Sequence, residues 1–170
     1  MEYIQIPTSD DFRVKQIYTS YCETFPEDER RGEQQFNSLF SRTNAKIFSV
    51  LDDLESVGYI VVWELSEFIF VEHFEVFPKY RCLGYGSQII AHLFKNYTHI
   101  VLESEPEHLD SNAARRIKFY QKNGFGIIDE LYVQPSYGEG RKPLDLWLLA
   151  NWTPTNTDWI KEEVYDTVYR

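Results

Sequence analysis

The residues best suited to chemistry lie in a short turn between a strand-like run and a helix-like run, at positions 76–87. This segment reads Val-Phe-Pro-Lys-Tyr-Arg-Cys-Leu-Gly-Tyr-Gly-Ser, so a proline ends the strand and two glycines, Gly84 and Gly86, stand where a helix begins. The first turn of a helix carries unpaired N–H groups and a partial positive charge, which together bind phosphate. Glycine lacks the Cβ atom that would keep a phosphate away from the backbone. The pattern indicates a phosphate-binding turn, although a bare Gly-x-Gly also occurs in tight turns that bind no ligand.

The turn differs from two common nucleotide-binding loops. A dinucleotide-binding fingerprint needs a third glycine and a parallel strand–helix–strand order, and both are missing here. A P-loop needs a Gly-Lys pair followed by Ser or Thr, which this segment lacks. Arg81 precedes the glycines, and its guanidinium can either add positive charge or fix the shape of the turn.

Two blocks of sequence, one containing this turn, resemble motifs of a single enzyme family. The strand at 72–76 followed by Arg-x-x-Gly-x-Gly at 81–86 resembles the acetyl-CoA-binding motif of the GCN5-related N-acetyltransferases, the GNAT family. The run Ala-Arg-Arg-Ile-x-Phe-Tyr-x-x-x-Gly-Phe at 114–125 resembles the helix that follows this motif in the family. The resemblance covers residues 1–150 and implies an acetyl-CoA-dependent N-acetyltransferase.

Two shorter features resemble one bacterial-type subgroup of this family. They are Phe-Pro-x-x-Glu-Arg at 25–30 and Gln-Pro-x-Tyr at 134–137. For the fold, the resemblance implies an α/β (α+β) domain built on a mixed, mostly antiparallel seven-stranded sheet, with helices on both faces. It also implies that the fourth and fifth strands of this sheet splay apart.

The resemblance implies that acetyl-CoA, a co-substrate used without a metal, lies in the gap between the splayed strands. Its pantetheine arm would hydrogen-bond to the backbone of the fourth strand at Phe74 and Val76. A backbone N–H near Phe74 would polarise the thioester carbonyl, as an oxyanion hole does. The pyrophosphate would lie against the turn, where the implied cofactor-binding residues are Arg81, Cys82, Leu83, Gly84, Tyr85, Gly86 and Ser87.

The implied reaction is attack of a neutral amine on the thioester, within a ternary complex of enzyme, acetyl-CoA and acceptor. An alkyl amine has a pKa of about 10.4, so a base or a chain of waters must remove its proton. Glu72 is the first candidate for this base because it shares a strand face with Phe74. Glu72 could instead bind the substrate or pair with a nearby Lys or Arg. Glu103 and Glu105, at the end of the next strand, are the competing bases.

Tyr120 matches the family's general acid, which protonates the leaving thiolate. A phenol with a pKa of about 10 and a thiol with a pKa of about 8.5 are close enough for a short proton transfer. The alternative role of Tyr120 is packing in the core beside the cofactor sulfur. A second hypothesis for the whole chain is a non-catalytic acyl-CoA sensor or regulatory module, against which the presence of both Glu72 and Tyr120 argues.

The elements that must position these residues follow from hydrophobic periodicity and from turn signals. Strands are expected at 2–6, 45–52, 57–65, 68–77, 99–103, 125–133 and 144–150. Helices are expected from a cap at 8–11 to Phe25, and then at 27–42, 84–95 and 110–122. We take residues 1–150 as the acetyltransferase domain and 151–170 as a C-terminal tail. The tail is expected to form a short helix from Asp158 that packs on the domain, or on a second subunit in a homodimer.

Composition and charge indicate one ordinary globular domain with an acidic surface. The chain has 170 residues, of which 43% are apolar and 26% charged. Its net charge is −10. Nucleic acids bind clustered Lys and Arg, so this balance argues against a nucleic-acid partner and also against anionic membranes. It favours a cationic acceptor, either a small-molecule amine such as a polyamine or an aminated antibiotic, or the lysine or N-terminal amine of a basic peptide.

Cysteine usage and the start of the chain bear on location. Cys22 and Cys82 make no disulfide framework. The first residues lack the basic and apolar regions of a signal peptide, and the run at 59–63 is far too short to span a bilayer. We therefore expect a reducing, cytoplasmic setting.

Overall fold

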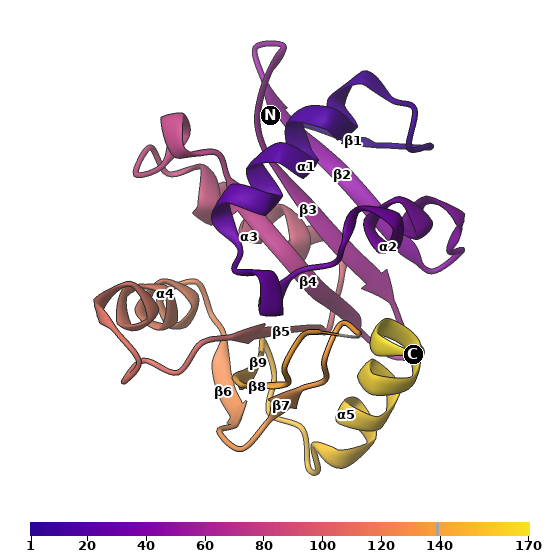
Figure 1. The fold of residues 1–170 in the computed structure, drawn as a ribbon. Helices are drawn as coiled ribbons and strands as arrows, with labels where there is room; N and C mark the ends of the chain where they lie inside the picture. Colours follow the sequence, from indigo (N-terminus) through magenta and orange to yellow (C-terminus); the bar gives the residue numbers. More distant parts are fainter. Residues whose placement is uncertain (139) are drawn as a thin grey trace.

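Seven strands form one mixed sheet in the computed structural model, which describes residues 1–138 and 140–170 (Figure 1). The strand order is β1-β2-β3-β4-β5-β9-β6, and every neighbouring pair is antiparallel except β4 and β5. The expected fold class, an α/β domain with a mostly antiparallel seven-stranded sheet, is confirmed. The strands of this sheet are β1 (Glu2–Gln5), β2 (Ala45–Asp52), β3 (Glu55–Glu64), β4 (Ile69–Val76), β5 (Ile100–Ser104), β6 (Gly126–Asp129) and β9 (Trp147–Ala150). A separate two-stranded ribbon consists of β7 (Val133–Gln134) and β8 (Leu144–Asp145).

The C-terminal strands are more broken than the sequence predicted. The run at 125–133 is divided into β6 and β7, because the Asp129 side chain accepts a 2.8 Å hydrogen bond from the Leu131 N–H and turns the chain. The run at 144–150 is likewise divided, into β8 and β9. The two expected strands are therefore four short ones, and only β6 and β9 join the main sheet.

Helices cover both faces of the sheet because successive side chains of a strand point to opposite faces. Along β3, Tyr59 and Val61 belong to a core shared with α1, α2 and α5, whereas Ile60 and Val62 belong to a core shared with α3 and α4. Figure 1 shows α1 and α2 in front of the sheet and α3 behind it. Within residues 1–138 and 140–170, none of the helices is long and apolar enough to cross a membrane. The helices are α1 (Phe12–Thr24), α2 (Glu33–Ser38), α3 (Tyr85–Asn96), α4 (Ser111–Lys122) and α5 (Asp158–Val164).

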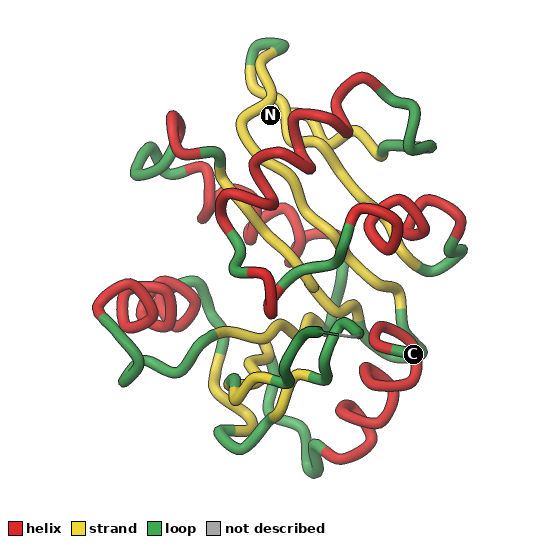
Figure 2. The backbone as a smooth tube through the Cα atoms, viewed as in Figure 1, coloured by secondary structure: helices red, strands yellow, loops and turns green. Residues whose placement is uncertain are grey.

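The prediction of a single helix over 27–42 is wrong, because an extended stretch interrupts this segment. A 3₁₀ turn at Glu27–Glu29 is followed by Arg30 with φ −139° and ψ 155°, and Gly32 then caps α2. Figure 2 shows this connection as a short helical turn between two loops. The extended stretch carries the Arg31 side chain into the interior, where the residue is only 8% exposed. Its ion pair with a buried carboxylate of β4, described below, accounts for the break.

Strands β4 and β5 pair over a short stretch and then separate. The pairing ends at Val71 and Leu102, whereas β4 continues to Val76 and β5 to Ser104. Among the described residues, the backbone of β4 beyond Val71 therefore has no strand on its β5 side. The splay that the resemblance implied is confirmed.

The segment after residue 150 belongs to the main core. Helix α5 and a π-helical turn at Tyr165–Tyr169 bury Ile160, Val164 and Val168 in the same core as α1. The domain boundary at residue 150 stays a prediction, and the buried side chains tie the segment after it to the rest of the chain.

Candidate active site

A cavity of about 1010 Å³ lies where β4 and β5 separate. Its wall combines the ends of both strands, the turn before α3, the inner side of α4 and the connection from α1 to α2. Leu83 is the one predicted site residue outside this lining, and its side chain is 64% exposed. The other predicted residues all line the cavity: Glu72, Phe74, Val76, Arg81, Cys82, Gly84, Tyr85, Gly86, Ser87 and Tyr120.

The turn before α3 has the backbone shape that a phosphate-binding turn requires. Cys82 and Gly84 adopt left-handed conformations, with φ of 65° and 88°, and fold the chain back into the first turn of α3. The N–H groups at the start of a helix have no acceptor within the helix, and they carry the positive end of its dipole. Tyr85, Gly86 and Ser87 supply such groups at the wall of the cavity.

Arg81 fixes the shape of this turn. Its Nε donates to the Val76 carbonyl at 3.0 Å, and its Nη2 lies 3.2 Å from the buried Glu75 Oε1 and 3.3 Å from Thr24 Oγ1. These bonds join the turn to the end of β4 and to α1. Of the two roles left open by the sequence, the hydrogen bonds favour shape over free positive charge.

The space beside Gly86 is filled by protein, which corrects the reason given for this glycine. A Cβ at Gly86 would lie 3.0 Å from Phe119 Cζ and 3.6 Å from Phe74 Cζ. The glycine therefore allows α3 to pack against the Phe119 ring of α4, and room for a phosphate is not what requires it. Gly84 differs, because its Cβ would meet only Gln88 Nε2, at 3.9 Å, and its positive φ is what favours glycine there.

The Glu72 side chain is fully buried, and its carboxylate is surrounded by hydrogen-bond donors. Its carboxylate accepts hydrogen bonds from Arg31 Nε at 2.8 Å, Trp63 Nε1 at 2.7 Å and the Tyr137 hydroxyl at 2.8 Å. Burial alone would raise the pKa of Glu72, but the Arg31 guanidinium and the donated hydrogen bonds lower it below its ordinary range. The carboxylate therefore stays ionised with its oxygens engaged. Pairing with an Arg is one of the roles that the sequence left open for it.

Glu103, on the neighbouring strand β5, differs from Glu72 because one of its carboxylate oxygens has no hydrogen-bond partner among the described residues. Its Oε1 accepts a hydrogen bond from the Tyr169 hydroxyl at 2.5 Å, while its Oε2 is shielded from solvent and has no hydrogen-bond partner among the described residues. Burial raises the pKa of Glu103 to about 8, the Tyr169 hydrogen bond opposes this rise, and the nearby Glu72 carboxylate adds to it. Glu103 lines the cavity, so this carboxyl titrates near neutral pH at the wall of the site.

Two further carboxyls face the same end of the cavity. Glu105 pairs with Arg116 at 2.5 Å. Burial and the neighbouring Glu105 carboxylate raise the pKa of Glu29 to about 7. The Glu29 carbonyl lies 3.0 Å from His73 Nε2, which holds the α1–α2 connection against β4. The sequence marked Glu29 as part of the Phe-Pro-x-x-Glu-Arg feature at 25–30 but did not identify it as a titrating group.

Tyr120 projects from α4 to the wall of the cavity. The residue is 8% exposed, and burial raises the pKa of its hydroxyl above the ordinary value. Its ring packs against Phe119 and Phe125, with centroid separations of 5.4 and 5.9 Å. The position of the ring is fixed by these contacts, so the hydroxyl has a defined place beside the splay.

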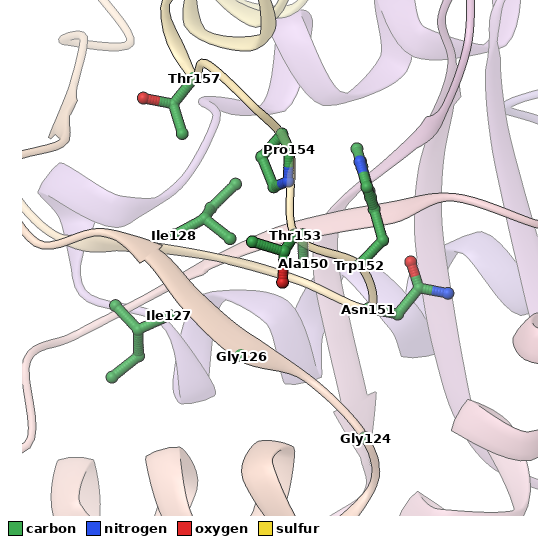
Figure 3. A pocket seen from close by; sticks show the side chains of 10 residues that line it. All are labelled: Gly124, Gly126, Ile127, Ile128, Ala150, Asn151, Trp152, Thr153, Pro154 and Thr157. Atoms are coloured by element: carbon green, nitrogen blue, oxygen red, sulfur yellow. The ribbon is translucent and has the colours of Figure 1, made fainter.

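A second cavity, of about 320 Å³, lies between β6, β9 and the segment before α5 (Figure 3). Asn151 at its edge is occupied structurally, since it accepts from the Ile100 N–H at 2.8 Å and donates to the Thr98 carbonyl at 2.9 Å. The lining contains no titratable side chain and none of the predicted site residues. The chemistry of the chain is therefore concentrated at the splay.

Comparisons with known proteins agree with this geometry. Residues 43–127 match the family described as the acetyltransferase (GNAT) domain. A solved structure from Bacteroides thetaiotaomicron, described as a GNAT-family acetyltransferase, is 31% identical in sequence. It superposes with a TM-score of 0.90, covering 99% of this chain and 98% of that one. The chain belongs to the GNAT acetyltransferase family.

Two other relatives show how far the similarity extends. YjbC of Bacillus subtilis strain 168, assigned by inference as an acetyltransferase, is 29% identical over 110 residues, which span 64% of this chain and 55% of that protein. A GNAT acetyltransferase from Elizabethkingia anophelis, solved with acetyl-CoA bound, is 16% identical with a TM-score of 0.60, covering 88% of this chain and 95% of that one. This GNAT chain thus shares its fold with a protein that holds acetyl-CoA.

Proposed function

We propose that this protein transfers an acetyl group from acetyl-CoA to a primary amine, by direct attack in a ternary complex. The observation that carries the proposal is the cavity between β4 and β5, whose lining includes the turn before α3 (the phosphate-type turn) and the carboxyl residues Glu29, Glu103 and Glu105. The binding of acetyl-CoA by the Elizabethkingia protein of the same fold supports the choice of co-substrate.

The residues around the cavity fit acetyl-CoA. Beyond Val71, none of the described strands pairs with β4 on its β5 side, so the backbone at Phe74 and the N–H of Val76 can pair with the amide groups of a pantetheine arm. The Val76 carbonyl already accepts a hydrogen bond from Arg81 Nε. The N–H groups of the turn before α3 would bind the pyrophosphate. This recognition uses backbone dipoles, so it is compatible with the net charge of −10. Acetyl-CoA supplies the activated acyl group, and the chain supplies alignment and proton transfer.

We propose Glu103, among the carboxyls considered as the base, as the group that takes the proton from the acceptor amine. Its Oε2 has no partner among the described residues and its pKa lies near 8, close to the range in which a general base works best. Glu72 is less suited, because three donors occupy its carboxylate and its pKa is lowered. The amine nitrogen then forms a bond to the thioester carbon while the carbon–sulfur bond breaks.

We propose Tyr120 as the acid for the departing thiolate. Its hydroxyl lies at the cavity wall, and its raised pKa keeps it protonated until the sulfur leaves. The phenolic proton goes to the sulfur, giving free CoA, and the phenolate recovers a proton from solvent. The proton on Glu103 is likewise released to solvent, so the cycle closes with both groups restored.

We propose a cationic acceptor. Glu29, Glu103 and Glu105 line the cavity, and Glu105 is already paired with Arg116. Glu29 and Glu103 are therefore the carboxyls that would attract a protonated amine and take its proton. Small polyamines, aminated antibiotics and basic peptides all have this chemistry.

Binding and turnover test the proposal separately. Acetyl-CoA at 100 times its Kd should stabilise the fold by about 2.7 kcal/mol, which corresponds to a rise in Tm of about 5–10 °C for a chain of this length. Ser87→Glu adds a negative charge at the wall of the phosphate-type turn and should abolish the rise. Gln88→Glu adds the same charge one residue on, outside the cavity lining, and should leave most of it. Equal shifts in both variants would show that the phosphates lie elsewhere.

Release of free thiol from acetyl-CoA, measured with a panel of polyamines, aminoglycosides, amino acids and basic peptides, tests the reaction itself. We expect amine-dependent release with at least one cationic acceptor. Stabilisation by acetyl-CoA without release for any amine would favour the non-catalytic acyl-CoA module. Absence of any stabilisation at millimolar acetyl-CoA would refute the co-substrate.

A further inference from the structure

The π-helical turn after α5 reaches the proposed base directly. The Tyr169 hydroxyl donates to Glu103 Oε1 at 2.5 Å, across 66 residues of sequence. The adjacent carbonyl of Val168 accepts a 2.7 Å hydrogen bond from Arg31 Nη2. The Tyr169 ring also packs against Tyr137 with a centroid separation of 5.1 Å. The tyrosine is therefore held by its backbone neighbour and by its ring, so its hydroxyl has a fixed position.

The two oxygens of Glu103 are made unequal by this contact. Oε1 is occupied by Tyr169, whereas Oε2 is shielded from solvent and has no partner within the described chain. An unpartnered carboxylate oxygen away from water is costly unless a ligand or a proton satisfies it. Glu103 lines the cavity, so a ligand bound there would lie beside this carboxyl.

The groups that face Glu103 come from several elements. Glu72 lies on β4 and Glu29 on the α1–α2 connection, and both carboxylates disfavour ionisation of Glu103. Tyr132 and Tyr169 are the neutral phenols beside it, and both favour its ionised form; of the two, Tyr169 makes the direct 2.5 Å hydrogen bond. Removing that one donor should therefore make Glu103 harder to ionise.

We propose that Tyr169 is a positioning residue for acetyl transfer: its hydroxyl holds Glu103 so that Oε2 alone receives the proton of the acceptor amine. The proposal rests on the proposed function, and it assigns to the segment 165–169 a part in the chemistry as well as in the core. The amine gives up one proton to Oε2, and Tyr169 keeps its own.

Tyr169→Phe tests this by removing only the hydroxyl. The acidic limb of the profile of kcat/KM against pH should move up by about one unit, which is about a tenfold loss at pH 7 and a loss within about twofold above pH 9.5. The ionisation of the amine itself is common to both proteins. Tyr165→Phe is the matched control, because Tyr165 lies on the same turn and its hydroxyl donates to the Val133 carbonyl at 2.7 Å, away from the cavity lining. It should leave the limb in place.

A titration that needs no turnover separates the two proposals. The ¹³C signal of the Glu103 carboxyl, assigned by its loss in Glu103→Gln, should titrate well above the ordinary glutamate range, and higher still in Tyr169→Phe. An equal loss of kcat/KM at all pH values, or a Glu103 titration unmoved by Tyr169→Phe, would overturn the positioning role. A wild-type protein with no amine-dependent thiol release would refute the proposed function, and the titration would still decide the contact between Tyr169 and Glu103.

Discussion

Replacing Glu72 by Gln tests whether Glu72 is a structural anchor, meaning a carboxylate that pairs with Arg31 in the core, or the catalytic base. The change removes one charge from a buried pair and leaves Arg31, which is 8% exposed, without its counter-ion. The glutamine oxygen can still accept a hydrogen bond, but its amide group would face one of the donors, Trp63 or Tyr137. Removing one partner of a buried ion pair costs about 3–5 kcal/mol. We therefore expect a large loss of stability.

For a chain of this length, such a loss lowers Tm by roughly 6–20 °C. Thermal and denaturant unfolding measure it, and an unchanged denaturant slope would show that the folded state keeps its compactness. Glu105→Gln is the control, because its partner Arg116 is partly exposed and the pair should contribute no more than about 1 kcal/mol. A Glu72→Gln protein with a Tm within about 2 °C of the wild type and a strongly reduced kcat would refute the anchor role and restore Glu72 as the base.

The effect of Glu72→Gln on stability should also depend on pH, in a direction set by the pKa of Glu72. The pKa of Glu72 is lower in the folded chain than its ordinary value of 4.5, so its ionisation stabilises the fold. That contribution is complete above about pH 4.5 and is lost as the pH falls through the folded-state pKa. The stability difference between wild type and Glu72→Gln should shrink as the pH falls below about 5.

The remaining predictions concern the other groups at the splay. Tyr120→Phe should lower kcat by about 100-fold with acetyl-CoA affinity retained, and near-normal turnover would leave Tyr120 a packing residue. Glu103→Gln should gain stability relative to the wild type as the pH rises from about 5 to 8, because the raised pKa of Glu103 makes its ionisation unfavourable to folding in that window. Unfolding curves at several pH values measure this, and parallel curves would contradict it. Gly86→Ala places a Cβ 3.0 Å from Phe119 Cζ and should cost about 1–3 kcal/mol. An unchanged unfolding midpoint would show that Phe119 moves freely.

Local patterns predicted the parts of the fold that depend on neighbours in sequence. Alternation of apolar residues located β2 to β4, and the Gly-x-Gly after a proline located the start of α3. The position of the splay came from the family resemblance, because nothing in the periodicity of residues 68–77 marks where pairing with β5 ends. The turn at Asp129 was missed, because a side chain that bonds the backbone two residues on leaves only a weak signal in an apolar run.

Residue type and strand parity identified the candidate bases and placed Glu72 first, but they carry no information on which carboxylates are already paired. Glu72 and Glu103 both lie on strands beside the cavity, and both are glutamates. What separates them is the number of donors brought from distant segments, since Arg31 lies 41 residues from Glu72 and Tyr137 lies 65 residues away. The apolar spacing over 27–42 predicted a continuous helix, so it gave no sign of the extended stretch that places the Arg31 side chain beside Glu72.

The charge of Glu72 affects the pKa of Glu103. Glu72 stays ionised because Arg31, Trp63 and Tyr137 all donate to it, and its fixed negative charge is one reason that Glu103 resists ionisation. A neutral group at position 72 would therefore lower the pKa of Glu103 while weakening the fold. Glu72 can thus influence proton transfer without touching the substrate, because it sets the field in which the neighbouring carboxyl titrates. In the Glu103 titration, Glu72→Gln should move the pKa down, opposite to Tyr169→Phe, and a shift in the same direction would contradict this coupling.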